Sequence, residues 1–89
     1  MIRITRRTME QETYIAVEGH LGDDGAKSLN QECERALLLR LPLRLDFRDV
    51  TFVEREAADF IRRLPAHRVR IVNCSSFVAQ QLNIQREAL

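Results

Sequence analysis

"LRLDFRDVTFVEREAADFIRRL", residues 43 to 64, is the stretch of sequence that decides the fold. From Leu43 to Phe47 apolar and polar residues alternate, which is the period of a strand with one buried face. From Ala57 to Leu64 the apolar residues return at helical spacing, and Pro65 ends the pattern. The stretch therefore predicts a half-buried strand that enters the core and leads directly into a helix.

The rest of the chain alternates between strand and helix patterns in the same way. Two short β-prone runs, residues 2–9 and 13–18, are joined by the polar link EQE and predict an antiparallel hairpin. Helical spacing recurs over residues 26–37 and 77–82, and a further strand is predicted at 69–71, before the second of these helices. Because helices separate the later strands, those strands are expected to pair in parallel. The predicted fold class is α/β, a mixed, mostly parallel four-stranded sheet with three helices in the order ββαβαβα.

The segment EGHLGDDG, which joins the second strand to the first helix, is rich in glycine and aspartate. Asp23 or Asp24 is expected to cap the helix, and His20 is expected to be a loop residue that touches a partner. Gly22 and Gly25 are not spaced as in a phosphate-binding loop. The segment therefore predicts a turn and a contact site, without nucleotide chemistry.

The size and composition are those of one soluble globular domain spanning residues 1–89. The chain is 45% hydrophobic and 30% charged, with 14 basic and 13 acidic residues, so it has no charge excess that would attract nucleic acid or lipid. No apolar run approaches the ~20 residues that span a bilayer, and the N-terminus does not have the apolar run of a signal peptide. We expect a cytoplasmic protein that is not inserted in a membrane.

The reactive side chains do not form a recognisable catalytic or metal-binding set. Cys74 lies between a strand and a helix start, where a nucleophile is conceivable, but the arginine of a phosphatase-type loop does not follow it, and a structural role is favoured. Cys33 occupies an apolar helix position and is interpreted as core filling. His20 and His67 have no partner at metal-ligand spacing. We therefore expect no catalysis, no cofactor and no metal.

Four arginines alternate outward on two predicted strands, and they would form a basic sheet face if those strands are neighbours. They are Arg44, Arg48, Arg68 and Arg70. The favoured interpretation is a solvated face with salt bridges, because few aromatic residues are present to stack on bases. The segment RVRIV is expected at a sheet edge, where the arginines would protect the edge from pairing, although a homodimer that covers it is also conceivable.

Residues 14–82 resemble the STAS domain of bacterial anti-sigma factor antagonists and sulfate-transporter tails. In EGHLGDDGAKSL the family's pattern at the end of a strand and the start of a helix keeps Gly19 and Leu21, while His20 and Gly22 replace its acidic residue and aspartate. The stronger match is the quoted stretch, in which Asp46, Val50, Phe52 and Val53 fall on the family's strand and turn positions. The resemblance implies a regulatory, protein-binding domain of bacterial signalling and transcription regulation.

The turn after that strand departs from the family. In the regulated antagonists a hydroxyl at this turn is phosphorylated, and the added charge of about −1.5 to −2 breaks the complex. Here Arg55 stands at the phosphoacceptor position, between Glu54 and Glu56, and Ala57 replaces the glycine. The resemblance therefore implies no phosphoacceptor and no switch of the usual kind. The family also adds a further strand and helix after VAQQL, which this chain is expected to lack.

The expected function is non-catalytic protein binding, as an anti-sigma factor antagonist or signalling adaptor whose partner is a kinase-like anti-sigma factor. The alternative is a structural STAS subunit of a membrane-associated phospholipid ABC transport complex, which would bind an ATPase subunit. The predicted partner-binding residues belong to two segments. They are Glu54, Arg55, Glu56, Ala57 and Ala58, with His20, Gly22, Asp23 and Asp24 of the loop His20 to Gly25. The interpretation of Glu54–Glu56 as an ordinary solvated helix start stays open.

Overall fold

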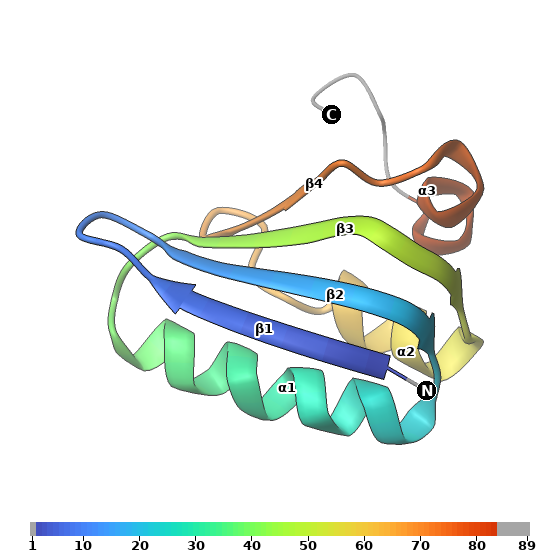
Figure 1. Cartoon of the computed structure of the whole chain (residues 1–89), viewed down its shortest axis with the longest axis horizontal. Coiled ribbons are helices and arrows are strands. Elements are labelled where there is room, and N and C mark those ends of the chain that lie inside the picture. The colour runs from blue at the N-terminus through green and yellow to red at the C-terminus, as the bar shows by residue number, and fades with distance from the viewer. Residues whose placement is uncertain (1, 84–89) are drawn as a thin grey trace.

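The computed structural model describes residues 2–83, which form one four-stranded sheet and three helices (Figure 1). The elements follow the predicted order ββαβαβα. They are β1 (Ile2–Thr8), β2 (Thr13–Leu21), α1 (Asp23–Leu38), β3 (Leu43–Val53), α2 (Arg55–Arg62), β4 (Val69–Val72) and α3 (Ser76–Leu82). The strands lie in the order β1-β2-β3-β4, with β1 antiparallel to β2 and the other pairs parallel. The predicted fold class is confirmed, whereas the expected lack of a further strand and helix falls on residues outside those described.

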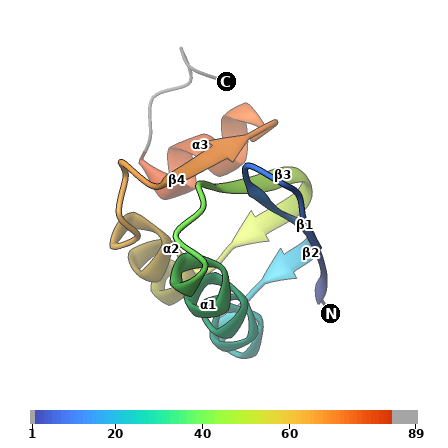
Figure 2. The ribbon, with the colours of Figure 1, turned by 90° about the vertical axis from the view of Figure 1, so that its left-hand side faces the viewer.

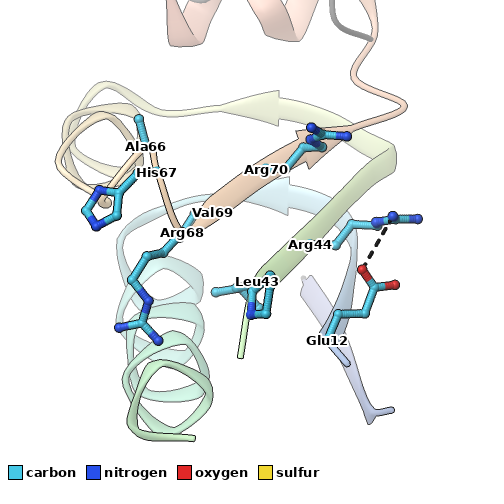
Figure 3. Close-up of a pocket in the computed structure, with 9 residues that line it drawn as sticks. Glu12, Leu43, Arg44, Ala66, His67, Arg68, Val69 and Arg70 are labelled. Atoms are coloured by element: carbon cyan, nitrogen blue, oxygen red, sulfur yellow. Dashed lines mark ion pairs between the residues drawn. The ribbon is translucent and has the colours of Figure 1, made fainter. Parts of the chain in front are cut away.

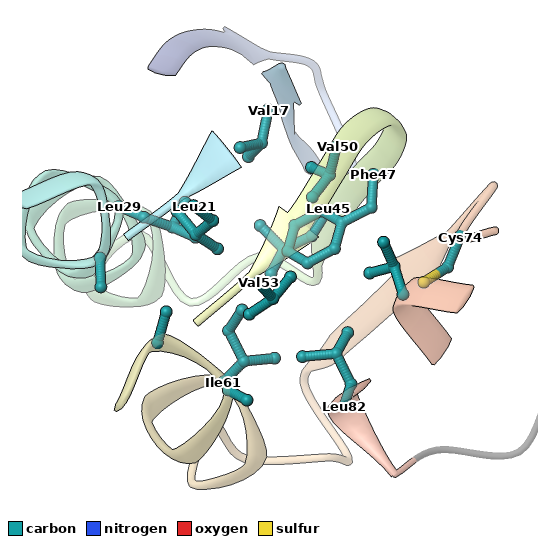
Figure 4. Close-up of a cluster of buried hydrophobic side chains, with 14 of the residues drawn as sticks. Val17, Leu21, Leu29, Leu45, Phe47, Val50, Val53, Ile61, Cys74 and Leu82 are labelled. Atoms are coloured by element: carbon teal, nitrogen blue, oxygen red, sulfur yellow. The ribbon is translucent and has the colours of Figure 1, made fainter. Parts of the chain in front are cut away.

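All three helices pack against one face of the sheet, and the other face is open. The buried side chains of β2 and β3, such as Ile15 and Leu45, alternate with Tyr14 and Arg44 on the opposite face. Figure 4 shows Leu29 and Ile61 of the helices meeting the sheet side chains, and Figure 2 shows the layers from the side. Apolar side chains are therefore buried on one face of the sheet only, and the other face stays exposed to solvent.

The end of β3 is displaced by two irregularities in its pairing with β2. The register shifts once between Ala16 and Glu18 and again between Gly19 and His20. Gly19 has φ 102°, a left-handed conformation that glycine adopts without strain, so it accommodates the second shift. The two shifts together add two residues to β3, so the alternation of faces is restored: Val53 points into the core, while Phe52 is 38% exposed.

Several local expectations are corrected at the start of α1. His20 is not in a loop, because β2 continues to Leu21. The N-cap of α1 is Gly22, which makes no side-chain capping bond, so neither Asp23 nor Asp24 is the cap. Both aspartates lie in the first turn, where their charges interact favourably with the helix dipole without a capping geometry.

The start of α3 has a side-chain cap. Ser75 is its N-cap, and its hydroxyl oxygen accepts a hydrogen bond of 3.1 Å from the backbone N–H of Val78. Cys74 and Cys33 are both buried, which confirms Cys33 as core filling. Burial and the nearby charge of Glu32 raise the pKa of the Cys33 thiol to about 12, so this thiol is not ionised at neutral pH.

Thr13 offers a test of how the sheet tolerates a buried polar group. Its side chain is fully buried, and Oγ1 has no hydrogen-bond partner in the described part of the chain. Thr13→Val keeps the shape and removes the unpaired hydroxyl, so we expect it to raise the free energy of unfolding by about 1 kcal/mol in urea denaturation. Thr5→Val, at an exposed position of β1, serves as the control and should change this free energy by less than about 0.5 kcal/mol. A loss of stability in Thr13→Val would show that the hydroxyl is hydrogen-bonded in solution.

Candidate functional site

The two segments predicted to share a site meet where β2 and β3 end. His20 Nε2 lies 2.7 Å from Glu54 Oε2, although the residues are 34 positions apart. The backbone N–H of Glu54 also donates a hydrogen bond of 2.9 Å to the carbonyl of Leu21. The start of α2 is thus joined to the end of β2 by both backbone and side chain.

Gly22 allows the Glu54 side chain to lie against this junction. A Cβ atom at Gly22 would stand 3.0 Å from Glu54 Oε2, closer than ordinary packing permits. Because the carboxylate contacts His20, Glu54 does not cap α2 with its side chain, although it is the N-cap residue. Beside it lies a cavity of about 480 Å³ that contains most of the predicted loop residues. Its lining is Ile2, His20, Gly22, Asp23, Asp24, Gly25 and Glu54.

Two exposed phenylalanines extend this site beyond the predicted residues. The rings of His20 and Phe52 stack with centroids 5.0 Å apart, and those of Phe52 and Phe77 lie 6.0 Å apart. Phe77, in the first turn of α3, is 54% exposed. We call His20, Phe52, Phe77 and Glu54 the ring–acid site.

The helical pattern over residues 77–82 includes Phe77 among its apolar residues, and the structure separates Phe77 from the buried ones. The buried residues of α3 are Val78, Ala79 and Leu82. The spacing of Val78 and Leu82 by four positions defines the buried stripe, and Phe77 falls outside it. That spacing could have identified Phe77 as exposed. Strand alternation could have identified Phe52, because counting by twos from Leu43 reaches Val53 on the buried face and leaves Phe52 on the other.

The surroundings of the ring–acid site are acidic. Asp23 and Asp24 lie at its edge, and Glu56 lines a second hollow of about 330 Å³ between α1 and α2. The nearby cations are Lys27, which is 3.9 Å from Asp23, Arg55 at the first position of α2, and Arg63, which lines the same hollow as Glu56. Carboxylates therefore outnumber cations at this end of the sheet, although the whole chain carries a formal charge of +1.

Two of the predicted contact residues are not available to a partner. Ala57 and Ala58 are 0% and 3% exposed, because they pack the start of α2 into the core. Their role is to hold α2 against the sheet, and the prediction that they contact a partner is corrected for these two. Arg55 and Glu56 on the same turn are exposed. The accessible part of the predicted segment is therefore its charged part.

The likeness to known proteins is one of structure and not of sequence. No protein-family model and no curated protein matches the sequence. The structure is similar to the crystal structure of an uncharacterized protein of the DUF3478 family from Shewanella loihica PV-4, described as having a SpoIIAA-like fold. The TM-score is 0.56 at 17% identity, over 89% of this chain and 71% of that chain. The fold is SpoIIAA-like.

The SpoIIAA-like fold is the fold of STAS domains and anti-sigma factor antagonists, so the resemblance seen in the sequence is confirmed at the level of fold. Within residues 2–83 no group of three or more metal-ligating side chains is gathered. Over the same residues, no helix is both long and apolar enough to cross a membrane.

Proposed function

We propose that this chain is a non-catalytic protein-binding module that contacts its partner through the ring–acid site. The observation that carries the proposal is the pair of exposed phenylalanine rings stacked beside the His20–Glu54 contact. Large exposed aromatic side chains with a polar rim are typical of protein interfaces, where they supply most of the binding free energy. The SpoIIAA-like fold supports this function, because STAS-type domains act by binding other proteins.

The site is rigid enough to act as a preformed surface. Phe52 belongs to β3, whose end is tied down because the N–H of Val53 donates a hydrogen bond of 2.8 Å to Gln81 Oε1 of α3. Glu54 is held by its bonds to Leu21 and His20. Side chains that are ordered before binding lose less conformational entropy when a partner docks.

The charge of the surroundings defines the partner's chemistry. Asp23, Asp24 and Glu54 line the hollow beside His20, whose ring stacks on Phe52, and Glu56 is exposed on the turn that follows Glu54. A complementary surface presents apolar side chains flanked by lysine or arginine, and such charges also accelerate association. The partner we propose is a kinase-like anti-sigma factor with a surface of this kind. Because Arg55 has no hydroxyl, binding is not switched off by phosphorylation at that position.

Removing one ring tests the proposal. Proteins captured from native cells on the immobilised chain are identified by mass spectrometry, and the dissociation constant of the purified partner is measured by calorimetry. We expect Phe77→Ala to raise this constant about tenfold or more, because aromatic anchors dominate interface energetics. The double reversal Glu54→Lys with Glu56→Lys should weaken binding further.

Leu38→Ala is the matched control, because Leu38 is 81% exposed on the far end of α1 and its loss should leave the dissociation constant unchanged. Recovery of a sigma-factor regulator supports the anti-sigma assignment, and recovery of a transport ATPase subunit supports the alternative of a transporter subunit. A partner whose affinity is the same for Phe77→Ala and Leu38→Ala would show that the ring–acid site is not the contact surface.

A further inference from the structure

On the edge of β4 that faces away from β3, some backbone N–H and C=O groups form no hydrogen bond with another described residue. Leu43 donates its N–H to the carbonyl of Arg68 at 2.8 Å, and because backbone direction alternates along a strand, Val69 and Ile71 turn their groups away from β3. The N–H of Val69 is bonded to the carbonyl of Pro65 at 3.0 Å. Within residues 2–83 the Val69 carbonyl and both backbone groups of Ile71 have no partner. This confirms the expectation that RVRIV lies at a sheet edge.

The side chains along this edge differ between the two faces of the sheet. Val69 and Ile71 are only half-buried against the core on the helix side. Arg70 projects on the open face, directly beside Arg44 of β3 in the parallel register. The edge therefore presents an apolar row on one face and a cation on the other.

Arg70 differs from Arg44 and Arg68 because no hydrogen bond or ion pair of its side chain to another described residue is seen. Arg44 is 3.4 Å from a carboxylate oxygen of Glu12, as Figure 3 shows. Arg68, which was expected on the same sheet face, instead donates a hydrogen bond of 2.9 Å to the carbonyl of Leu37 at the end of α1. Two like charges side by side on neighbouring strands are unfavourable, and an added carboxylate next to Arg70 would relieve this cost.

We propose that β4 receives an extended acidic segment of a partner protein, which adds to the sheet as a fifth strand. The backbone of that segment bonds to Val69 and Ile71. Its side chains alternate, so that an aspartate or glutamate meets Arg70 on the open face while apolar neighbours cover Val69 and Ile71 on the helix face. The segment is thus recognised by a short alternation of acidic and apolar residues.

Other occupants fit this edge less well. In a second copy paired antiparallel about Ile71, Val72 would lie opposite Arg70, so no carboxylate would be supplied. In the row of the open face that holds Arg44 and Arg70, a nucleic-acid strand would find the ring of Tyr14 and, close by, the carboxylates of Glu12 and Asp46, which repel phosphate. A peptide with separate acidic residues supplies a carboxylate to Arg70 and carries no phosphate to be repelled.

This edge is distinct from the ring–acid site. Arg70 lies beside Arg44 at the start of β3, whereas Phe52 and Glu54 lie at its end. The two surfaces are therefore at opposite ends of the same strand, and the failure of one as a binding site does not affect the other.

The test uses a short fluorescein-labelled peptide that alternates valine and glutamate, with binding followed by fluorescence anisotropy at low salt. We expect saturable binding that weakens about tenfold or more for Arg70→Glu. Arg63→Glu, an exposed arginine after α2, is the matched control and should bind as the wild type does. The same peptide N-methylated at alternate residues should lose binding by a similar factor, because it cannot pair with the edge.

Three outcomes overturn the proposal. The first is equal binding of a peptide with the same composition but with all glutamates at one end, and the second is equal binding of the N-methylated peptide, since either result would show nonspecific charge attraction. The third is a different occupant, seen as tighter binding of oligouridylate than of the peptide, or as a dimer in analytical ultracentrifugation that Arg70→Glu dissociates. Circular dichroism of each variant confirms that the fold is retained.

Discussion

Phe47→Ala is expected to lower the free energy of unfolding by about 3–5 kcal/mol, the cost of deleting a fully buried aromatic ring. Phe47 is 0% exposed and is the largest of the fully buried side chains. In Figure 4 it lies in the middle of the core cluster, close to Leu45 and facing the side chains of the helices. The whole stability of a small domain is about 5–15 kcal/mol, so the variant should be close to its unfolding midpoint under mild conditions.

The same substitution at Phe77 provides the control, because it removes the same atoms from a side chain that is 54% exposed. Phe77→Ala should change the free energy of unfolding by less than about 1 kcal/mol. Both values come from urea denaturation followed by circular dichroism. Equal losses in the two variants would mean that Phe77 is buried in solution, and this would remove the basis of the ring–acid site. A stable Phe77→Ala variant also ensures that its loss of partner binding is not a loss of folding.

Asp46→Ala is expected to lower the free energy of unfolding by about 2–3 kcal/mol at pH 7. The carboxylate is 8% exposed at the centre of the open sheet face. It accepts hydrogen bonds from the hydroxyl of Tyr14 and, at 2.9 Å, from the backbone N–H of Arg48. Hydrogen bonds to a charged acceptor contribute more than neutral ones, and their loss leaves the Tyr14 hydroxyl without its partner.

The effect of Asp46 depends on pH in a defined direction. Burial by itself raises the pKa of Asp46, but the hydrogen bonds from Tyr14, Arg48 and Asn73, together with the charge of Arg48, hold this pKa below its ordinary value. A carboxyl whose pKa is lower when folded contributes stability that is complete above its unfolded pKa of about 3.9 and is lost as the pH falls through the folded value. The difference between wild type and Asp46→Ala should therefore be full at pH 7 and shrink toward zero in acid.

Two measurements check this interpretation. Asp49→Ala removes an exposed carboxylate from the same strand and should cost less than about 0.5 kcal/mol. Tyr14 is the single tyrosine of the chain, and its hydrogen bond to Asp46, its burial and the charge of Asp46 raise its pKa. A spectroscopic titration of the phenol should therefore show a lower pKa in Asp46→Ala. An unchanged phenol titration would contradict the proposed contact between the two side chains.

The structure separates the residues that stabilise the fold from those available for binding. Ala57 and Ala58 were predicted to contact a partner, yet they anchor α2 in the core. Phe52 and Phe77 were placed only as apolar positions of a strand and a helix, and they form the exposed part of the ring–acid site. Hydrophobicity alone marks these two alanines and two phenylalanines as apolar, but it does not decide whether each lies in the core or on the surface. The domain boundary of residues 1–89 stays a prediction.

Local sequence determined most of the architecture. Alternation over residues 43–47 and helical spacing over residues 57–64 depend only on near neighbours, so strand, turn and helix could be read without the structure. The pairing of β1 with β2, the parallel crossovers and the edge position of β4 then followed from the order of the elements. The absence of a hydroxyl at Arg55 was likewise visible in the sequence alone.

Only the tertiary structure decided how the functional surfaces are composed. The contact between His20 and Glu54 joins residues 34 positions apart, and the rings of His20, Phe52 and Phe77 come together from β2, β3 and α3. The position of Arg70 beside Arg44, which pairs with Glu12, is set by the parallel register of β3 and β4. These features arise from contacts between elements that are distant in sequence. A local periodicity specifies which residues alternate, but the register between strands is set by packing of the whole sheet.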